Sequence, residues 1–286
     1  MLDIIGDFEL TKKSQSVFNA LIEGRRPIEG EKAGSAEEMI HREGPSYGLE
    51  SYPDPFVSFV ETVHKKLSSI GQTLISILRW RYAQEGPPSP FGSRGLFCSG
   101  NNGESWHPLP GRYSIQNVTP PYSVFELNEI DADEIIALLK SNAQEPLGHE
   151  LLREAKELQY TSPRSAVLIA VSAIEVAVKS VIMTKVPDAA WFIENIQSPP
   201  VVNILTKYLP ILFSNVSRFY EPRKESGTIK VLNEAVTIRN QIVHKGVSPP
   251  KDEKISEILD AIQELLWVCD YFSGNLWAEE YISRKV

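Results

Sequence analysis

The chain has 286 residues, of which 42% are hydrophobic, with 29 Lys and Arg against 37 Asp and Glu and with two cysteines. This length accommodates one large domain or two ordinary ones with buried cores, so a globular protein is expected. Cys98 and Cys269 lie far apart and make no disulfide framework, which excludes the small disulfide-rich secreted class. The N-terminus shows no secretion signal either, and we therefore expect a cytoplasmic protein.

The longest apolar stretch of the sequence is 167–183. Ser172, Glu175 and Lys179 interrupt it, whereas a membrane helix needs roughly 18 uninterrupted apolar residues. We therefore expect no membrane span and no membrane partner.

The acidic charge belongs to the first half of the chain. Residues 1–148 carry 13 Lys and Arg against 20 Asp and Glu, a net charge of −7, while residues 149–286 carry 16 against 17, a net charge of −1. Pro- and Gly-rich stretches are also dense in the first half, whereas helical patterns dominate after Gly148. We therefore place a domain boundary between an acidic domain at 1–146 and a second domain at 147–286.

The N-terminal domain is predicted to be a small mixed α/β module of unknown role. The spacing of apolar residues, and the residues that begin or end helices and strands, define its elements. They are a helix at 55–70 with Gly71 as its stop, a strand at 73–82, shorter strands at 96–99 and 113–118, and a helix at 131–141 capped by Asp131.

The C-terminal domain is predicted to be all helical. The expected helices cover 149–160, 163–184, 187–196, 201–208, 228–245 and 252–272. Pro163 suits the first position of its helix, and the almost wholly apolar surface of 163–184 marks that helix as the buried centre. The prediction is an up-and-down helical bundle, and the fold class is α+β overall.

One hexapeptide, Arg239-Asn240-Gln241-Ile242-Val243-His244, places three groups suited to phosphate chemistry in the helix 228–245. Asn240 and His244 lie about 40° apart on the edge of its polar face. Arg239 instead projects from the middle of the apolar arc, where a charged side chain needs a partner. The face that carries Arg239 is therefore expected to meet something other than a plain core.

The spacing of Arg239-Asn240 and His244 resembles the Arg-x(4–6)-His signature of the HEPN superfamily of helical-bundle ribonucleases and nucleic-acid-associated modules. A buried helix with Glu175 and Lys179 upstream and a long amphipathic helix downstream also fit that family. The resemblance covers about residues 147–280 and leaves the first half unrecognised. It implies an endoribonuclease of a prokaryotic toxin or phage-defence system, with Arg239, Asn240 and His244 as catalytic residues and Glu175 in support. Many family members are instead inactive interaction modules.

The chemistry of these residues agrees with RNA cleavage that needs no metal or other cofactor. Histidine can take and give the protons of the 2′-hydroxyl and the leaving oxygen, and arginine offers a bidentate fork to phosphate. His244 cannot fill both proton roles at once. A homodimer through the C-terminal bundle would supply a second copy and would give Arg239 a polar cleft to face. The product would be a 2′,3′-cyclic phosphate.

Positive charge surrounds the hexapeptide. The stretch from Arg218 to Lys251 contains seven Lys and Arg and three Glu, a surplus of four positive charges. Such a surplus can follow an RNA backbone or can simply be a solvated face. The RNA-binding candidates are Arg218, Arg223, Lys224, Lys230 and Lys245.

Each candidate has a structural alternative. His244 can serve only to cap carbonyls at its helix end, and Arg239 can form a structural salt bridge with Glu175. The bundle would then be a catalytically silent dimerisation or nucleic-acid-binding module. Sensing of a trigger molecule, or binding of an antitoxin, would belong to residues 1–146. A third alternative places the activity itself in this domain, whose loops around Arg94, His107 and Arg112 could bind a ligand or a phage component. Within that domain Cys98 and His107 make only half a metal site, so no metal is expected.

Overall fold

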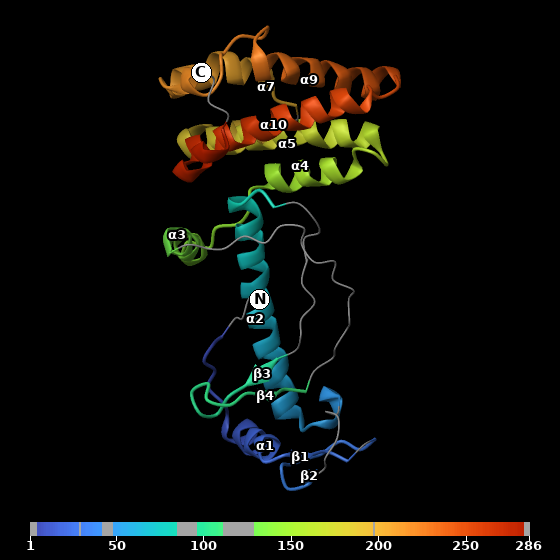
Figure 1. Cartoon of the computed structure of the whole chain (residues 1–286), viewed down its shortest axis with the longest axis vertical. Coiled ribbons are helices and arrows are strands. Elements are labelled where there is room, and N and C mark those ends of the chain that lie inside the picture. Colours follow the sequence, from blue (N-terminus) through green and yellow to red (C-terminus); the bar gives the residue numbers. More distant parts are fainter. Residues whose placement is uncertain are drawn as a thin grey trace. The chain divides into compact units, whose positions relative to one another are not determined.

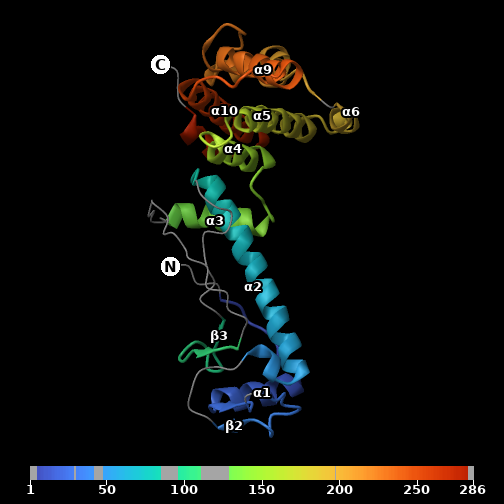
Figure 2. The same cartoon turned by 90° about the vertical axis from the view of Figure 1, so that its right-hand side faces the viewer.

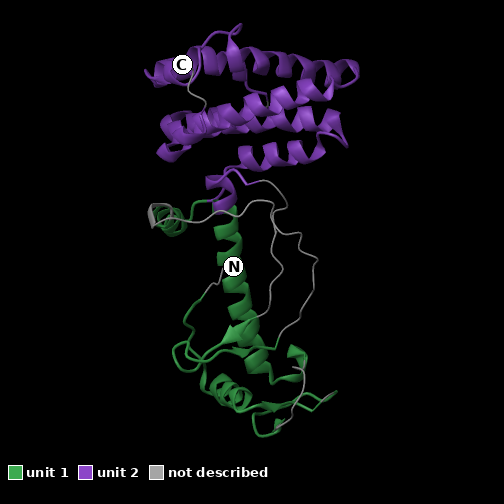
Figure 3. Ribbon diagram, in the orientation of Figure 1, with its two compact units in different colours: residues 1–77, 87–143 green, residues 78–86, 144–286 purple. Residues whose placement is uncertain are grey.

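The computed structural model describes residues 5–28, 30–41, 48–84, 96–110, 129–196 and 198–282. These residues are mostly helical and form two compact units, which Figure 3 colours separately. Unit 1 contains 1–77 and 87–143, and unit 2 contains 78–86 and 144–286. The second unit therefore begins near the expected boundary but also takes a short piece of chain from the first half of the sequence.

Unit 1 is built from three helices and two very short strand pairs among its described residues. Its elements are α1 (Lys12–Ile22), β1 (Arg25–Arg26), β2 (Ile40–His41), the turn η1 (Leu49–Ser51), most of α2 (Asp54–Arg81), β3 (Phe97–Cys98), β4 (His107–Pro108) and α3 (Glu129–Lys140). The strands pair antiparallel, β1 with β2 and β3 with β4. Its core is formed by apolar side chains of α1, of the segment at η1 and of the start of α2, among them Phe18, Leu21, Tyr52 and Phe56.

The prediction of a strand at 73–82 is wrong. One continuous helix, α2, runs from Asp54 to Arg81 and passes through Gly71, as Figure 1 shows. A glycine inside a helix costs only about 1 kcal/mol relative to alanine, so it need not end one. The buried residues Ile77, Trp80 and Arg81 follow the three- and four-residue spacing of a helix.

The other expectations for unit 1 have mixed outcomes. β3 lies within the strand expected at 96–99, whereas the strand expected at 113–118 falls outside the described residues. The helix α3 already includes Glu129, so Asp131 lies inside it and cannot be its cap. The mixed α/β module is therefore mainly helical where it is described, and α1 was not predicted.

Unit 2 is a helical bundle. Its elements after the end of α2 are α4 (Leu147–Leu158), α5 (Pro163–Lys185), η2 (Pro187–Ala189), α6 (Ala190–Asn195), α7 (Val201–Asn203), the π-helical turn η3 (Ile204–Tyr208), α8 (Leu209–Leu212), η4 (Val216–Arg218), α9 (Gly227–Lys245), α10 (Asp252–Ser273) and η5 (Leu276–Tyr281). The helices expected at 163–184, 228–245 and 252–272 are confirmed, within one residue at each end. The short helical pieces between them appear roughly where they were expected.

The four long helices of unit 2 lie alongside one another in Figures 1 and 2. The short loops 159–162 and 246–251 join α4 to α5 and α9 to α10 as antiparallel pairs. The longer segment 186–226, which carries the short helices, connects the two pairs. The bundle thus contains two antiparallel hairpins of helices, joined by a long connection.

Helix α5 is the centre of this bundle. It packs against α4, α9 and α10, and ten of its residues are buried. By length and composition it could cross a membrane, which the sequence argument had excluded. Its packing identifies it as a core helix. Gly148 allows α4 to approach α5 closely, because a Cβ there would lie 3.1 Å from the Ala173 carbonyl oxygen.

Candidate functional site on helix α9

Helix α9 presents one stripe of residues to the bundle. The buried side chains of this stripe belong to Thr228, Ile229, Leu232, Ala235 and Ile242. Arg239 falls in the same stripe at helical spacing. The helix ends at Gly246, whose φ of +63° is the left-handed conformation typical of a helix stop. The last turn of α9, with His244, is therefore fixed by a local signal.

Arg239 has three polar neighbours from three segments of unit 2. Its Nη2 donates to the Glu175 carboxylate of α5 in an ion pair and lies 3.4 Å from Ser198 Oγ. Its Nη1 donates to Asn240 Oδ1 at 3.1 Å. The side chains of Arg239 and Glu175 are 19% and 13% exposed. The expectation that Arg239 meets something other than apolar core is confirmed, and its partner is a carboxylate of the same chain.

Glu175 is available to Arg239 because Lys179 is engaged elsewhere. Lys179 lies one turn further along α5 and donates to the Ile196 carbonyl oxygen. This contact holds the chain just before Ser198, the residue that approaches Arg239. Glu175 and Lys179 thus contact different segments and form no ion pair with each other in the described structure.

His244 lies in the last turn of α9 and is exposed, as is Asn240. Its imidazole has no hydrogen bond or ion pair with any described residue. The Ile242 carbonyl oxygen is instead capped by the backbone N–H of Gly246 at 3.1 Å. The alternative in which His244 only caps the helix end therefore finds no contact to support it.

The basic RNA-binding candidates do not gather around Arg239. Arg218 and Arg223 are ion-paired with Glu279 and Glu221. Lys224, Lys230 and Lys245 are exposed. Lys230 lies nine positions before Arg239, about 180° around α9. The local surplus of charge is therefore spread around the helix and does not form one track beside the hexapeptide.

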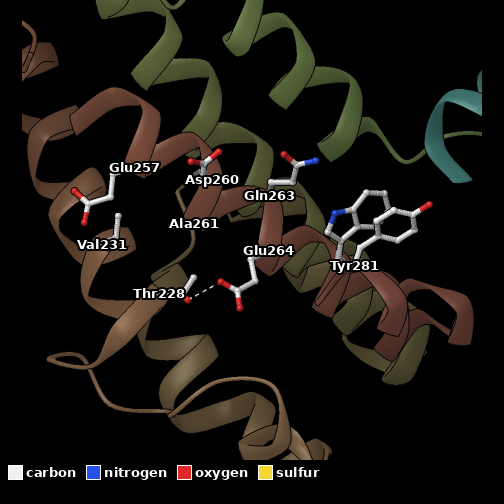
Figure 4. A pocket seen from close by; sticks show the side chains of 9 residues that line it. Thr228, Val231, Glu257, Asp260, Ala261, Gln263, Glu264 and Tyr281 are labelled. Carbon is white, nitrogen blue, oxygen red and sulfur yellow. Dashed lines mark hydrogen bonds between the residues drawn. The ribbon is translucent and has the colours of Figure 1, made fainter. Parts of the chain in front are cut away.

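A cavity of unit 2 lies between α10 and the first half of α9, and Arg239 does not line it (Figure 4). Its volume is about 440 Å³, and three carboxylates, those of Glu257, Asp260 and Glu264, line it together with Trp267 and Tyr281. No basic side chain lines it. Because like charges repel, this cavity is a poor site for a phosphate group.

Cys98 and His107 are cross-strand neighbours on β3 and β4. The Cys98 Sγ lies 3.4 Å from the His107 carbonyl oxygen, and burial raises the pKa of the Cys98 thiol to about 11. A protonated thiol is a poor metal ligand, and no group of three or more ligand side chains occurs among the described residues. The alternative ligand site in the loops around Arg94, His107 and Arg112 stays a prediction, because Arg94 and Arg112 lie outside the described residues.

Sequence reasoning missed a buried polar network in unit 2. Asp270 of α10 accepts a hydrogen bond from Trp80 Nε1 at 2.7 Å, and its Oδ2 also lies 2.7 Å from His149 Nε2. The three residues are 3–7% exposed. The signal was present, because Asp270 interrupts the apolar stripe of α10 as Arg239 interrupts that of α9. No family model, curated protein or solved structure matches the chain, so the assignment of function rests on the chemistry of these sites.

Proposed function

We propose that the protein is a metal-independent endoribonuclease whose site lies on the last two turns of α9. Arg239 binds the scissile phosphate, His244 transfers protons, and Asn240 orients either the imidazole or the phosphate. Glu175 holds the Arg239 guanidinium. The 2′-hydroxyl of the RNA is the nucleophile, which leaves a 2′,3′-cyclic phosphate. By its resemblance to HEPN proteins we place this activity in a toxin or phage-defence setting.

The observation that carries the proposal is the orientation of the Arg239 guanidinium. Arg239 and His244 project about 140° apart on an ideal helix, too far for both to face one point directly. The hydrogen bond from Arg239 Nη1 to Asn240 Oδ1 turns the guanidinium toward the side of α9 that carries His244. A purely structural salt bridge to Glu175 does not need this second contact. A phosphate placed at Asn240 would thus be within reach of both groups.

A homodimer completes the proposed site. Proton transfer to the leaving oxygen and from the 2′-hydroxyl needs two groups, and each copy of α9 provides one imidazole at its end. Val243 and Val247 of this region are 54% and 39% exposed, and Val243 lies one turn from Arg239. An isologous contact through this end of α9 would cover them and bring two hexapeptides together.

The test is an RNA cleavage assay in excess EDTA with analysis of the product ends. A 2′,3′-cyclic phosphate formed by the wild-type protein and not by His244→Ala supports the proposal. Cleavage that stops in EDTA and returns with Mg²⁺ would assign the protein to another nuclease class. Cleavage by the variant at the wild-type rate would remove His244 from the mechanism.

The second candidate is a catalytically silent helical module for dimerisation or nucleic-acid binding. The ion pair between Arg239 and Glu175 favours it, because it already occupies Nη2 of the guanidinium. In that case unit 1 would bind the trigger or antitoxin, and the bundle would assemble the protein. Dimerisation or RNA binding that persists in His244→Ala, without any cleavage by the wild type, would select this function.

A further inference from the structure

A second group of basic side chains lies on α4. His149, Arg153 and Lys156 follow one another at four- and three-residue spacing, so they share one face of this helix. With Arg79 from the end of α2 they line a small cavity of about 30 Å³. All four belong to unit 2. We call this cavity the α4 niche.

The α4 niche concentrates buried positive charge. Arg79 is 8% exposed. Burial lowers its pKa, and the positive charge of Arg153 lowers it further. Arg153 is ion-paired with Glu145, and its Nε donates to the Gln84 carbonyl oxygen at 3.2 Å. Two guanidinium groups thus stay close together in a poorly hydrated place, where an anion would relieve their repulsion.

The side chains that line the niche carry three positive charges, those of Arg79, Arg153 and Lys156. Four carboxylates lie around it: Glu145 pairs with Arg153, Asp270 contacts His149, and Glu150 and Glu157, which are both exposed, also act on Arg79. No carboxylate is among the described residues that line the niche itself. This lining is the opposite of the cavity beside α9, which has three carboxylates and no basic side chain.

His149 offers a polar atom to the niche. The residue is 7% exposed, and Asp270 occupies its Nε2 side at 2.7 Å, so the nitrogen left over is Nδ1. Nδ1 has no hydrogen-bond partner among the residues that the structure describes. At Nδ1, a neutral imidazole can accept a hydrogen bond from a protonated phosphate oxygen, and an imidazolium can donate one to an unprotonated phosphate oxygen. Trp80 Nε1 donates to the same Asp270 oxygen, Oδ2.

The size of the niche limits its ligand. Its volume accommodates one or two waters or one compact oxyanion, but not a nucleoside. The donors present are guanidinium, ammonium and imidazole groups, together with Gln263 of α10. Guanidinium and ammonium groups form their strongest hydrogen bonds with phosphate and carboxylate oxygens. The Lys156 ammonium donates to Gln263 Oε1 at 2.7 Å and has two further protons to donate. Groups from two helices can each donate to a different oxygen of a tetrahedral anion.

We propose that the α4 niche binds a phosphate group, held by Arg79, Arg153, Lys156 and His149. The group is either inorganic phosphate or the terminal phosphate of a larger molecule whose remainder stays outside. The site uses neither Arg239 nor His244, so it is separate from the proposed ribonuclease site. Binding would clamp α4 to the end of α2 within unit 2 and stabilise that part of the bundle.

The test is isothermal titration of the full chain with inorganic phosphate and, in a parallel arm, with adenosine 5′-monophosphate. Binding of both identifies a phosphomonoester site open to larger molecules, and binding of inorganic phosphate alone identifies a site for the free ion. Lys156→Gln, at a half-buried position, and Arg79→Met should each weaken binding about tenfold or more, because each removes one charge-assisted contact. Lys185→Gln makes the same charge change at the exposed end of α5 and should leave the affinity unchanged.

Three outcomes would overturn the proposal. They are no heat of binding for either probe at millimolar concentration, unchanged affinity in Lys156→Gln, and an equal loss of affinity in Lys185→Gln. Arg79 is buried, so if Arg79→Met does not fold, Lys156→Gln decides alone. Circular dichroism of each variant shows which case applies.

Discussion

The sharpest test separates the roles of Arg239 and His244 by measuring activity and stability in the same preparations. His244 is exposed and contacts no described polar group, so His244→Ala should change the free energy of unfolding by no more than about 0.5 kcal/mol. Loss of a proton-transfer group should nevertheless slow RNA cleavage about 100-fold or more. That factor corresponds to about 2.7 kcal/mol in the activation free energy.

Arg239→Ala should lose activity to a similar degree but should also destabilise the protein. The substitution leaves the Glu175 carboxylate, 13% exposed, without its cation. Fully buried pairs cost about 3–5 kcal/mol when one partner is removed. Because a fifth of the arginine side chain reaches solvent, we expect about 1–3 kcal/mol.

The measurements are urea unfolding followed by circular dichroism and initial rates of RNA cleavage in EDTA. Gln241→Ala, an exposed neighbour on α9, is the matched control and should change neither quantity. A wild-type cleavage rate in His244→Ala would refute the catalytic role. A stability loss in His244→Ala equal to that in Arg239→Ala would refute the reasoning from exposure.

Three further predictions follow from the same structure. Cleavage should fail on DNA of the same sequence, which lacks the 2′-hydroxyl nucleophile, and equal cleavage of DNA would contradict the mechanism. Val243→Glu should leave the monomer folded, lower the activity and shift the protein from dimer to monomer in mass photometry. Ile242→Glu should instead unfold the protein, since Ile242 is 8% exposed. A folded, dimeric Val243→Glu would exclude this interface. Trp80→Phe should destabilise unit 2 by about 1–2 kcal/mol in thermal unfolding, because the Asp270 carboxylate loses a buried donor, and an unchanged unfolding curve would show that this bond is dispensable.

The burial of Ile242 shows what the apolar periodicity of a helix can and cannot predict. The apolar arc of the helix 228–245 correctly identified the core-facing side of α9, but the apolar pattern alone does not distinguish Ile242 from Val243. The structure buries Ile242 inside its own bundle and leaves Val243 more than half exposed. Which apolar residues a neighbouring helix covers depends on helix packing, and periodicity alone does not contain that information.

The sequence by itself determined the long helices of the C-terminal half and the anomaly at Arg239. Apolar spacing, Pro163 and Gly246 are local signals that act within a few residues, so α5 and α9 could be bounded without knowledge of the fold. Local signals were ambiguous at 73–82, where leucine and aromatic residues fit both strand alternation and helical spacing. Burial of Ile77 and Trp80 decided in favour of a helix.

Only the tertiary structure decided the partners of the charged and polar side chains. Glu175 is 64 positions from Arg239, Asp270 is 121 from His149, and Trp80 is 190 from Asp270. It also assigned residues 78–86 to the second unit, away from the boundary that composition indicated. A buried charge requires a partner, and that requirement can be read from sequence. The identity of the partner cannot, because helix packing brings together residues whose separation along the chain follows no local rule.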